Sequence, residues 1–357
     1  MTVDRRQFLQ LSGASLATPL FGGCSGHKRI PVEGVPRSDF DEDSTAEEVT
    51  EGLDLTGKIA VVTGCTSGIG YETMRVLALR GAYVIGTGRT VEKAQASCSS
   101  VIGKTTPVAL ELSDFDSVVA CAESIRSLNS PIDMLICNAG MRGSKEREQV
   151  YGLEKHFVVN HLGHYILVQN LLERLYLAWQ GRIVVVASRS AYGGAPEEGI
   201  EFGNLRGASN YSRSRAYGHS KLANVLFSLE LARLLKGSRI TSNSLHPGVI
   251  NTEIDRTEPG LFQFAFGVLT AVGGKSIEQG AATSCYVATS PLLGEVSGQY
   301  FEDCNAVTVL GNNHMHDQEQ ATKLWQVSEA LTKDYLDEIE TPDWDDFEHG
   351  IRKRPES

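Results

Sequence analysis

The chain is poor in the features that would indicate a nucleic-acid partner, a metal cluster or a membrane span. Its 33 lysines and arginines are outnumbered by 44 acidic residues, the formal net charge is -11, and the body of the chain holds no basic cluster, which argues against nucleic acid. The seven cysteines show no Cys-x-x-Cys spacing and no zinc-like cluster with histidine. The apolar stretch near the N-terminus is too short and glycine-rich for a convincing transmembrane helix.

The order of apolar runs predicts the fold class. At 357 residues the chain is long enough for one large α/β domain or two small ones. Short β-rich runs alternate regularly with helical patterns, which favours an α/β fold with a single Rossmann-type, doubly wound parallel sheet of about seven strands and helices on both faces. The candidate strands are residues 58–63, 82–87, 105–112, 132–137, 181–187, 239–245 and 298–302, and long helical patterns cover residues 156–178 and 213–236.

A glycine-rich loop, Thr-Gly-Cys-Thr-Ser-Gly-Ile-Gly over residues 63–70, stands between an apolar run and a helical pattern. Glycines let the backbone turn tightly and approach a pyrophosphate, and the N-terminus of the following helix offers free N–H groups and a positive dipole end. A lone glycine triplet is weak evidence. Here a strand precedes the loop and a second β-rich run follows the helix, so the pattern indicates a dinucleotide-binding turn.

Tyr217 and Lys221 are four residues apart in the run Ala-Tyr-Gly-His-Ser-Lys-Leu-Ala-Asn, on one face of a predicted helix. An ammonium beside a phenol stabilises the phenolate. Lowering the pKa of a phenol from about 10 to about 7 needs roughly 4 kcal/mol, and one unit charge about 4 Å away supplies that at an intermediate dielectric. Tyr-x-x-x-Lys also arises by chance in helices, but beside the glycine loop the pair predicts a hydride-transfer enzyme.

These features and further motifs in the same order resemble the short-chain dehydrogenase/reductase family, in its branch of retinol dehydrogenases and WW-domain oxidoreductases. The resemblance covers about residues 44–335. The further motifs are Cys-Asn-Ala-Gly at 137–140, Val-Asn-His-Leu-Gly-His at 159–164, Ile-Val-Val-Val-Ala-Ser at 183–188, His-Pro-Gly-Val-Ile-Asn-Thr at 246–252, Glu-Gln-Gly-Ala-Ala-Thr at 278–283 and Gly-Gln-Tyr-Phe at 298–301.

The resemblance implies a catalytic set of four residues. Tyr217 would donate a proton to a carbonyl oxygen or remove one from an alcohol, and Lys221 would lower the pKa of Tyr217 and hold the nicotinamide ribose. Ser188 would hydrogen-bond the same oxygen, and Asn160 would support a water-linked proton relay to the lysine. The plainer alternatives are Ser188 as a strand cap, Asn160 as the filler of a helix kink and Lys221 as a solvated side chain.

The resemblance also implies a cofactor site and no metal. Its residues are Gly64, Thr66, Ser67, Gly68, Ile69, Gly70, Arg89, Glu111, Leu112, Asn138, Ala139, Gly140, Tyr217, Lys221, Pro247, Gly248 and Thr252. Two positions depart from the family pattern, Cys137 in place of an asparagine and Glu111 in place of an aspartate, and we expect the nucleotide site to survive both. His156, His161 and His164 lie on one predicted helix, but the family carries the last two without a metal.

Charge near the end of the second predicted strand indicates which nucleotide binds. Arg89 follows this strand, about 20 residues past the glycine loop, where the second ribose of the dinucleotide would lie. No carboxylate occupies residues 86–88 to repel a 2′-phosphate, and a planar guanidinium can clamp one. The sequence therefore favours NADP(H) over NAD(H).

Residues 1–26 resemble a bacterial twin-arginine export signal, because Arg5 and Arg6 precede a mildly apolar stretch. Phe-Gly-Gly-Cys at 21–24 also resembles a lipoprotein processing site, which makes Cys24 a candidate for a lipid and for attachment to a membrane. If the signal is used, the enzyme is extracytoplasmic, either periplasmic or membrane-anchored; otherwise it is cytoplasmic. The alternative is a disordered leader with an incidental arginine pair.

The remaining organisation follows from composition. Residues 27–52, rich in Asp, Glu, Pro and Ser, are predicted to form an acidic linker, residues 53–336 the NADP-binding oxidoreductase domain and residues 337–357 a charged tail. A disulfide between Cys285 and Cys304 is conceivable but has no support in the sequence.

Substrate and partners follow least directly from the sequence. Family position places the segment from Gly248 to about residue 275 over the substrate cleft, and its apolar residues suggest a small lipophilic aldehyde, ketone or alcohol; they are Leu261, Phe262, Phe264, Phe266, Val268 and Leu269. The same residues would equally cover the core or meet another subunit, and the family allows a homodimer or a monomer. The alternative functions are a catalytically silent NADP-binding sensor or scaffold, against which the intact catalytic set argues, and an interaction protein that uses the charged tail.

Overall fold

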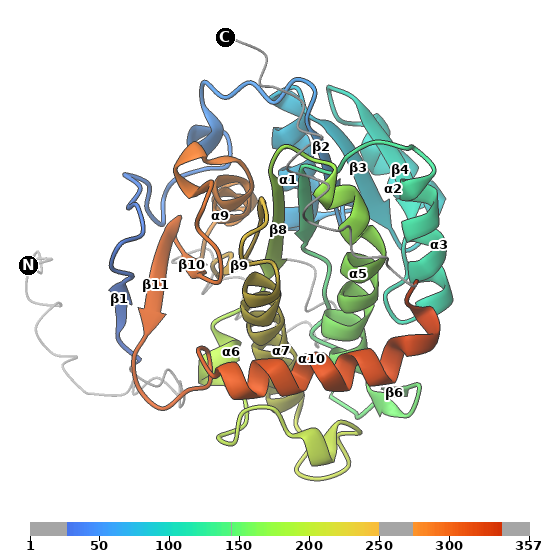
Figure 1. Cartoon of the computed structure of the whole chain (residues 1–357), viewed down its shortest axis with the longest axis vertical. Helices are drawn as coiled ribbons and strands as arrows, with labels where there is room; N and C mark the ends of the chain where they lie inside the picture. Colours follow the sequence, from blue (N-terminus) through green and yellow to red (C-terminus); the bar gives the residue numbers. More distant parts are fainter. Residues whose placement is uncertain (1–26, 144, 250–273, 338–357) are drawn as a thin grey trace, which may run out of the picture.

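The computed structural model of the protein describes residues 27–143, 145–249 and 274–337 (Figure 1). Its centre is a nine-stranded sheet in the order β1-β11-β10-β9-β8-β5-β2-β3-β4. The parallel strands are β2 Ile59–Val62, β3 Tyr83–Gly88, β4 Thr105–Ala109, β5 Met134–Cys137, β8 Gly181–Val186, β9 Ile240–His246 and β10 Tyr300–Glu302. Each matches a predicted strand, so the predicted doubly wound α/β fold is confirmed.

Two strands beyond the predicted seven extend one edge of the sheet. β11 Asn305–Val309 runs antiparallel to β10, and β1 Arg29–Pro31 runs antiparallel to β11. The turn from β10 to β11 uses Asp303 and Cys304 with positive φ angles of 49° and 61°. This hairpin lies outside the alternation of helix and strand on which the prediction rested. A separate ribbon pairs β6 Gln149–Val150 with β7 Leu153–Glu154.

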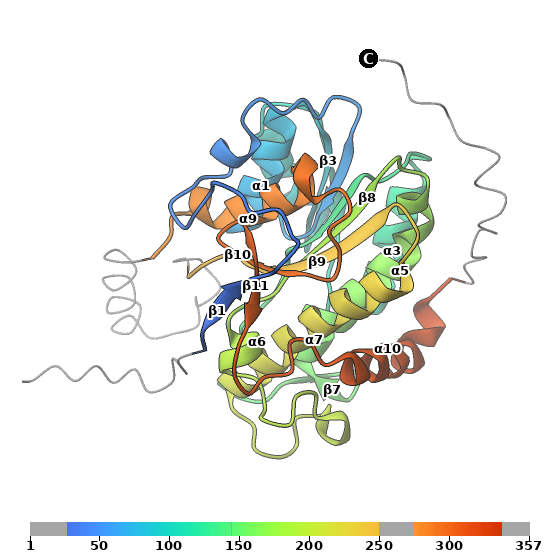
Figure 2. The ribbon, with the colours of Figure 1, turned by 60° about the vertical axis from the view of Figure 1, so that its left-hand side comes forward.

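Helices cover both faces of the sheet (Figure 2). α1 Gly68–Leu79, α2 Val91–Ser99 and α9 Ile277–Thr289 contribute to one apolar cluster, and α3 Phe115–Arg126, α5 Gly163–Tyr176 and α7 Arg213–Leu234 to the other. Alternate side chains of one strand point to opposite faces, so Val61 belongs to the second cluster while Ala60 and Val62 belong to the first. The shorter or later elements are α4 Lys155–Phe157, η2 Val158–Leu162, α6 Ser190–Gly193, α10 Gln318–Thr332 and the 3₁₀ turns η1 Glu48–Thr50, η3 Phe202–Asn204, η5 Pro291–Leu293 and η6 Lys333–Tyr335.

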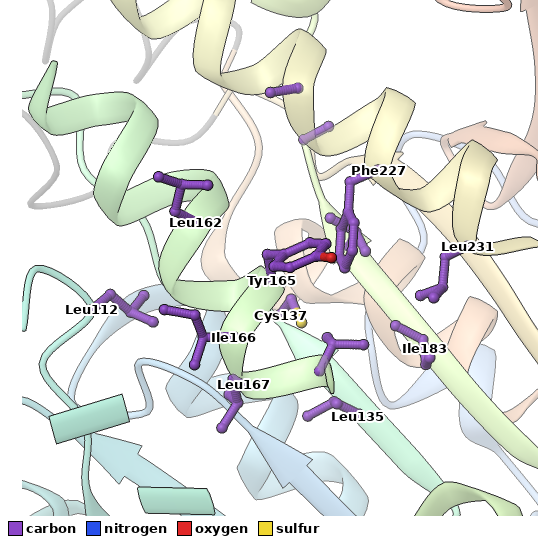
Figure 3. Packing of buried hydrophobic residues seen from close by; sticks show 14 of the residues in the cluster. Leu112, Leu135, Cys137, Leu162, Tyr165, Ile166, Leu167, Ile183, Phe227 and Leu231 are labelled. Carbon is purple, nitrogen blue, oxygen red and sulfur yellow. The ribbon is translucent and has the colours of Figure 1, made fainter. Parts of the chain in front are cut away.

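The core between α5 and α7 is aromatic at its centre. Figure 3 shows Tyr165 and Phe227 beside each other, with ring centroids 5.7 Å apart. Trp325 of α10 packs against both rings, at 5.1 Å from Tyr165 and 6.0 Å from Phe227. Aromatic pairs at these separations bury large areas. The helix α10 is thereby held across α5 and α7 (Figure 1).

The predicted linker over residues 27–52 is wrong, because this segment is part of the folded domain. Besides the pairing of β1 with the sheet, Ala46 and Val49 are buried in the α1/α9 cluster, and the Ala46 N–H donates to the Glu278 carbonyl at 2.9 Å. The Phe40 ring packs edge-on against Tyr286 at 5.8 Å. These few apolar side chains follow neither a strand nor a helix period, so the acidic average composition concealed them.

Other predictions about organisation fall partly outside the described residues. The export signal with Cys24, the segment 250–273 and the tail from residue 338 are not among them. Asp337, the first residue of the predicted tail, forms an ion pair with Arg126. Cys285 and Cys304 are buried free thiols. Among the described residues, no helix has both the length and the apolarity needed to span a bilayer.

The strand order determines where a ligand can bind. β2 is flanked by β3 on one side and by β5 on the other. The segments that follow β2 and β5 therefore diverge towards opposite faces of the sheet, and a crevice opens at their carboxyl ends. The glycine loop follows β2 and the Cys-Asn-Ala-Gly motif ends β5, so both predicted nucleotide motifs lie at this crevice.

Candidate active site

The glycine loop has the backbone that a nucleotide turn requires. Gly64 and Gly68 adopt φ angles of 73° and 59°, in the left-handed region that side chains disfavour. The Gly64 N–H donates to Thr87 Oγ1 at 3.3 Å and the Cys65 N–H to the Thr87 carbonyl at 2.8 Å, which ties the loop to the end of β3. The Cys65 thiol is buried and bonds the Val62 carbonyl at 3.0 Å.

Glycine is also required in the loop by close packing. A Cβ on Gly70 would collide with the Gly64 carbonyl and the Asn138 side-chain amide, and one on Gly64 would stand 2.9 Å from the Ala139 Cβ. On the far side, a Cβ on Gly88 would stand 2.6 Å from Thr66. The loop, the end of β3 and the segment after β5 thus leave no room for a methyl group between them.

The N-terminus of α1 fits a dinucleotide pyrophosphate. Ser67 is the N-cap residue and forms no side-chain capping bond, and the first turn holds no acidic residue. Thr66 and Ser67 are exposed, and Ile69 is partly buried. Backbone N–H groups and the positive end of the helix dipole therefore face a site that suits a phosphate. Together with the glycine packing, this shows that the residues present fit the nucleotide.

The residues predicted for the adenine end of the site follow β3 and β4. Arg89 is exposed directly after β3, and within the described part of the chain no carboxylate pairs with it. Glu111 turns back on its own segment, where its carboxylate accepts from the Ser113 hydroxyl at 2.7 Å and from the Ser113 N–H at 3.0 Å. This turn ends β4 before the predicted residue 112. Leu112 is buried against Gly163.

Asn138 and Ala139 are held by Thr63, a residue that the sequence prediction did not include. The Asn138 side chain donates to the Thr63 carbonyl at 2.8 Å, and the N–H groups of Asn138 and Ala139 both donate to Thr63 Oγ1 at 2.9 Å. His164 Nε2 contacts the same hydroxyl at 3.0 Å, and its Nδ1 contacts the Asn160 carbonyl at 3.2 Å. His164 therefore links the nucleotide loop to the helix that carries Asn160.

The three histidines considered as metal ligands belong to three separate networks. His156 Nδ1 contacts Glu154 at 2.6 Å, and its other nitrogen contacts the Arg142 carbonyl. His161 Nε2 contacts the Ser328 hydroxyl at 2.8 Å. Burial lowers the pKa of His161 to about 3 and that of His164 to about 4, so both are neutral at pH 7. Among the described residues, no group of three or more suitable side chains is placed to hold a metal.

Asn160 lies in η2, a π-helical turn between α4 and α5, and such turns recur at functional sites. Its side chain is fully engaged: Oδ1 accepts from the Met141 N–H at 2.8 Å, and Nδ2 donates to the Met141 carbonyl at 3.0 Å and to Ser220 Oγ at 2.9 Å. The Ser220 hydroxyl in turn donates to the Tyr217 carbonyl at 2.8 Å. Asn160 thus joins the segment after β5 to the turn of α7 that carries Tyr217.

Lys221 is buried beneath Tyr217, so its alternative as a solvated side chain is wrong. The Lys221 residue is 4% exposed, and its Nζ donates to the Val186 carbonyl at 2.9 Å and lies 5.8 Å from the centre of the Tyr217 ring. A Cβ on Gly140 would stand 3.4 Å from Lys221 Nζ and 3.2 Å from Asn160 Oδ1, so the three residues meet. Burial lowers the pKa of Lys221 from 10.5 to about 8.

Ser188 lies between β8 and the short helix α6, one residue before the N-cap of α6. Its Oγ accepts from the Ser190 N–H at 3.2 Å, which is the local capping contact named among the alternatives. The helices α6 and α7 contact each other, and a Cβ on Gly218 would collide with the backbone of Gly194. This close approach brings the segment of Ser188 to Tyr217. Two side chains that the sequence prediction did not place at the catalytic site lie beside the Tyr217 ring: the Arg142 guanidinium is over it at 6.0 Å, and the His156 ring is edge-on to it at 6.3 Å.

The segment after β9 is described only at its start. Pro247 is buried, and Gly248 has a φ angle of 102° beside the Lys275 side chain. Thr252 and the apolar residues from Leu261 to Leu269 lie outside the described residues. The glycine loop at the crevice and the Asn160, Tyr217 and Lys221 assembly beside it define a nicotinamide-dinucleotide oxidoreductase.

Known proteins agree with this class. Residues 58–199 match the profile of the short chain dehydrogenases. The short-chain dehydrogenase TIC 32 A, chloroplastic, of Brassica napus is 38% identical over 83% of this chain and 95% of its own length. The WW domain-containing oxidoreductase of Gallus gallus is 37% identical, over 86% of this chain and 75% of its own length. Retinol dehydrogenase 12 of Mus musculus is 38% identical, over 78% of this chain and 87% of its own length. The chain belongs to the short-chain dehydrogenase/reductase family.

Solved structures share the fold. A crystal structure from Mycobacterium Paratuberculosis is 29% identical, with a TM-score of 0.63, and covers 80% of this chain and 97% of that one. The Pseudomonas aeruginosa RhlG/NADP active-site complex is 23% identical, with a TM-score of 0.56 over 70% of this chain and 95% of that one, and shows the fold alone. As a family member, the protein is an oxidoreductase that acts on CH–OH groups and binds NAD(P)(H).

Proposed function

We propose that the protein is an NADP-dependent oxidoreductase that interconverts a carbonyl and an alcohol on a small lipophilic aldehyde, ketone or alcohol. The observation that carries this proposal is the buried Lys221, whose Nζ donates to the Val186 carbonyl and lies 5.8 Å from the centre of the Tyr217 ring, with Gly140 between it and Asn160. Burying an ammonium group destabilises a fold, so its presence beneath Tyr217 indicates a chemical role.

Each side chain has a distinct task in the proposed reaction. A bound nicotinamide would supply the hydride to the carbonyl carbon in reduction, or accept it from the alcohol carbon in oxidation. Tyr217 gives its phenolic proton to the carbonyl oxygen, and the Lys221 ammonium stabilises the phenolate that remains. The Ser188 hydroxyl orients the same oxygen. Asn160 holds the segment after β5 and, through Ser220, the backbone at Tyr217, so the proton donor stays in place.

The test is NADPH oxidation by the purified full-length protein against short, aromatic and long-chain aldehydes and ketones. We expect turnover on the lipophilic members, in keeping with relatives named retinol dehydrogenase. Tight NADPH binding without turnover on any carbonyl of the panel would instead favour the silent sensor or scaffold. The structure offers that alternative no specific support, because a binding module needs no buried lysine beneath a tyrosine.

The preference for NADP rests on Arg89, which is exposed beside the glycine loop. We expect Arg89→Ala to raise the Kd of NADPH about 10- to 100-fold, because a charge-assisted hydrogen bond contributes roughly 1.5–3 kcal/mol, and to leave that of NADH within about twofold. Fluorescence titration with both nucleotides measures this. Lys236→Ala, which removes the same charge at the far end of α7, is the control. Tighter binding of NADH than of NADPH by the unaltered protein would contradict the proposal.

The export route remains a proposal that rests on Arg5, Arg6 and Cys24. If Cys24 carries a lipid, only four residues lie between it and Arg29 of β1, and the five steps of the chain reach at most about 18 Å, so the sheet edge would lie close to the membrane. We expect the double change Arg5→Lys and Arg6→Lys to leave the protein in the cytoplasmic fraction. Wild-type recovery in the extracytoplasmic fractions despite both changes would show that the arginine pair is not a signal.

A further inference from the structure

A buried carboxylate at the end of β10 accepts five hydrogen bonds and lies outside the catalytic set. The Glu302 residue is 3% exposed. Its oxygens accept from Arg29 Nη1 at 2.7 Å, from Arg189 Nε at 2.9 Å and Nη2 at 2.7 Å, from Tyr192 Oη at 2.9 Å and from Tyr300 Oη at 3.2 Å. Two guanidinium groups from distant parts of the sequence thus share one buried carboxylate.

Two of these donors belong to the segment that immediately follows Ser188. Arg189 is the N-cap residue of α6, and Tyr192 lies within it. The C-cap of α6, Gly194, is the residue whose backbone touches Gly218 of α7, one position after Tyr217. The helix α6 therefore lies between Ser188 and the α7 contact beside Tyr217, and Glu302 bonds two of its side chains, Arg189 at its N-cap and Tyr192.

No other described carboxylate near Arg189 is free to replace Glu302. Asp303 lies 3.9 Å from Arg189 but pairs with Lys275 at 2.6 Å. His246, opposite Glu302 on β9, is buried, and neither ring nitrogen has a hydrogen-bond partner among the described residues; burial lowers its pKa to about 3, so it stays neutral. Charge pairing for Arg189 and Arg29 consequently depends on Glu302.

We propose that Glu302 is a positioning residue that holds α6 against α7 and thereby fixes Ser188 relative to Tyr217, with Arg29 of the N-terminal strand as part of the same device. The strand β1 ahead of the dinucleotide-binding core is then required for full catalytic rate, through the contact of Arg29 with Glu302. The kinetic part of this proposal rests on the proposed function; the structural part does not.

The experiment compares Glu302→Gln and Arg29→Ala with the unaltered full-length protein. The matched control is Lys58→Ala: Lys58 has a side-chain exposure of 40% and pairs at 2.9 Å with the buried Asp133, as Arg29, at 37%, pairs with Glu302. Hydrogen exchange of the peptide 188–194 reports on α6 directly. We expect exchange at least about tenfold faster in both variants and unchanged in Lys58→Ala.

Kinetics distinguish positioning from general stability. We expect kcat on a panel carbonyl to fall about 10- to 100-fold in Glu302→Gln and less in Arg29→Ala, with the Kd of NADPH within about twofold and partial recovery of kcat in Arg29→Lys. Unchanged exchange at 188–194 overturns the proposal whatever the turnover. Faster exchange without loss of kcat, or an equal loss in Lys58→Ala, overturns it as well.

Failure of the proposed function gives a different result. If the unaltered protein turns over no carbonyl, that function is wrong, while exchange at 188–194 still decides whether Glu302 holds α6. If Glu302→Gln does not fold, Arg29→Ala and Arg29→Lys are compared with the unaltered protein instead. Arg29 is partly exposed, and Arg189 keeps its partner Glu302 in both of these variants.

Discussion

Tyr217→Phe abolishes carbonyl reduction while leaving nucleotide binding intact. We expect kcat to fall by roughly 10²–10⁴-fold, because the change removes the proton donor and general acid–base catalysis contributes about that much in rate. The Kd of NADPH stays within about twofold, since the ring remains and the glycine loop, α1 and Arg89 are untouched. Stopped-assay NADPH oxidation and fluorescence titration on the same preparation measure the two quantities.

The control for this change is Tyr83→Phe. Its hydroxyl contacts Thr106 Oγ1 at 2.7 Å between β3 and β4, outside the catalytic assembly. Both variants lose one phenolic oxygen, so a difference in kcat between them reports on the chemistry and not on lost hydrogen bonds in general. More than a tenth of wild-type turnover in Tyr217→Phe would mean that another group donates the proton.

Lys221→Met has the second largest expected effect, and it acts in opposite directions on activity and stability. We expect kcat to fall at least about a hundredfold, because the phenolate loses the adjacent charge that stabilises it. The same change stabilises the nucleotide-free protein at pH 7, since methionine fills a similar volume and leaves no buried charge. Residues that are required for activity often destabilise the fold in this way.

The pH dependence of unfolding tests the second half of this prediction. Burial lowers the pKa of Lys221 to about 8 from its ordinary 10.5, so between these values the unfolded chain holds a proton that the native protein has released. The free energy of unfolding therefore rises with pH from about 8 to about 10.5, by roughly 3 kcal/mol at most, and the whole penalty is present below pH 8.

Urea unfolding in the absence of nucleotide, at pH 7.5 and at pH 10, measures this rise in the free energy of unfolding. The two pH values are chosen below and above the Lys221 pKa of about 8. We expect it in the unaltered protein and in Lys236→Met, and we expect its loss in Lys221→Met. An identical pH slope in all three proteins would show that Lys221 is charged in the native state throughout this range.

The local motifs of this protein were readable because their chemistry depends on neighbours in sequence. The glycine loop needs small residues within one turn, so spacing alone indicated Gly64 and Gly70, and the structure shows the close contacts that require them. Tyr217 and Lys221 lie one helical turn apart, so the period of the helix placed them on one face. The seven parallel strands were predicted for the same reason, as short apolar runs between helices.

Other features depend on contacts between distant residues, and sequence reading failed on them. The segment 27–52 was interpreted as a linker from its composition, yet Arg29 is paired with Glu302, which is 273 positions further along the chain. His164 belonged to a family motif and was expected to bind no metal, but nothing in the sequence indicated its contact with Thr63 across 101 positions. No local pattern signals such partners.

The sequence by itself therefore determined the fold class, the nucleotide turn and the pairing of Tyr217 with Lys221, because periodicity and loop chemistry act over a few residues. Asn160 and Ser188 were implied by the family resemblance. Only the tertiary structure decided that Lys221 is buried, that Asn160 ties Met141 to Ser220, and that the N-terminal strand completes the sheet beside Glu302. Burial and long-range hydrogen bonds arise when segments far apart in the chain pack together, and that packing is a property of the whole fold.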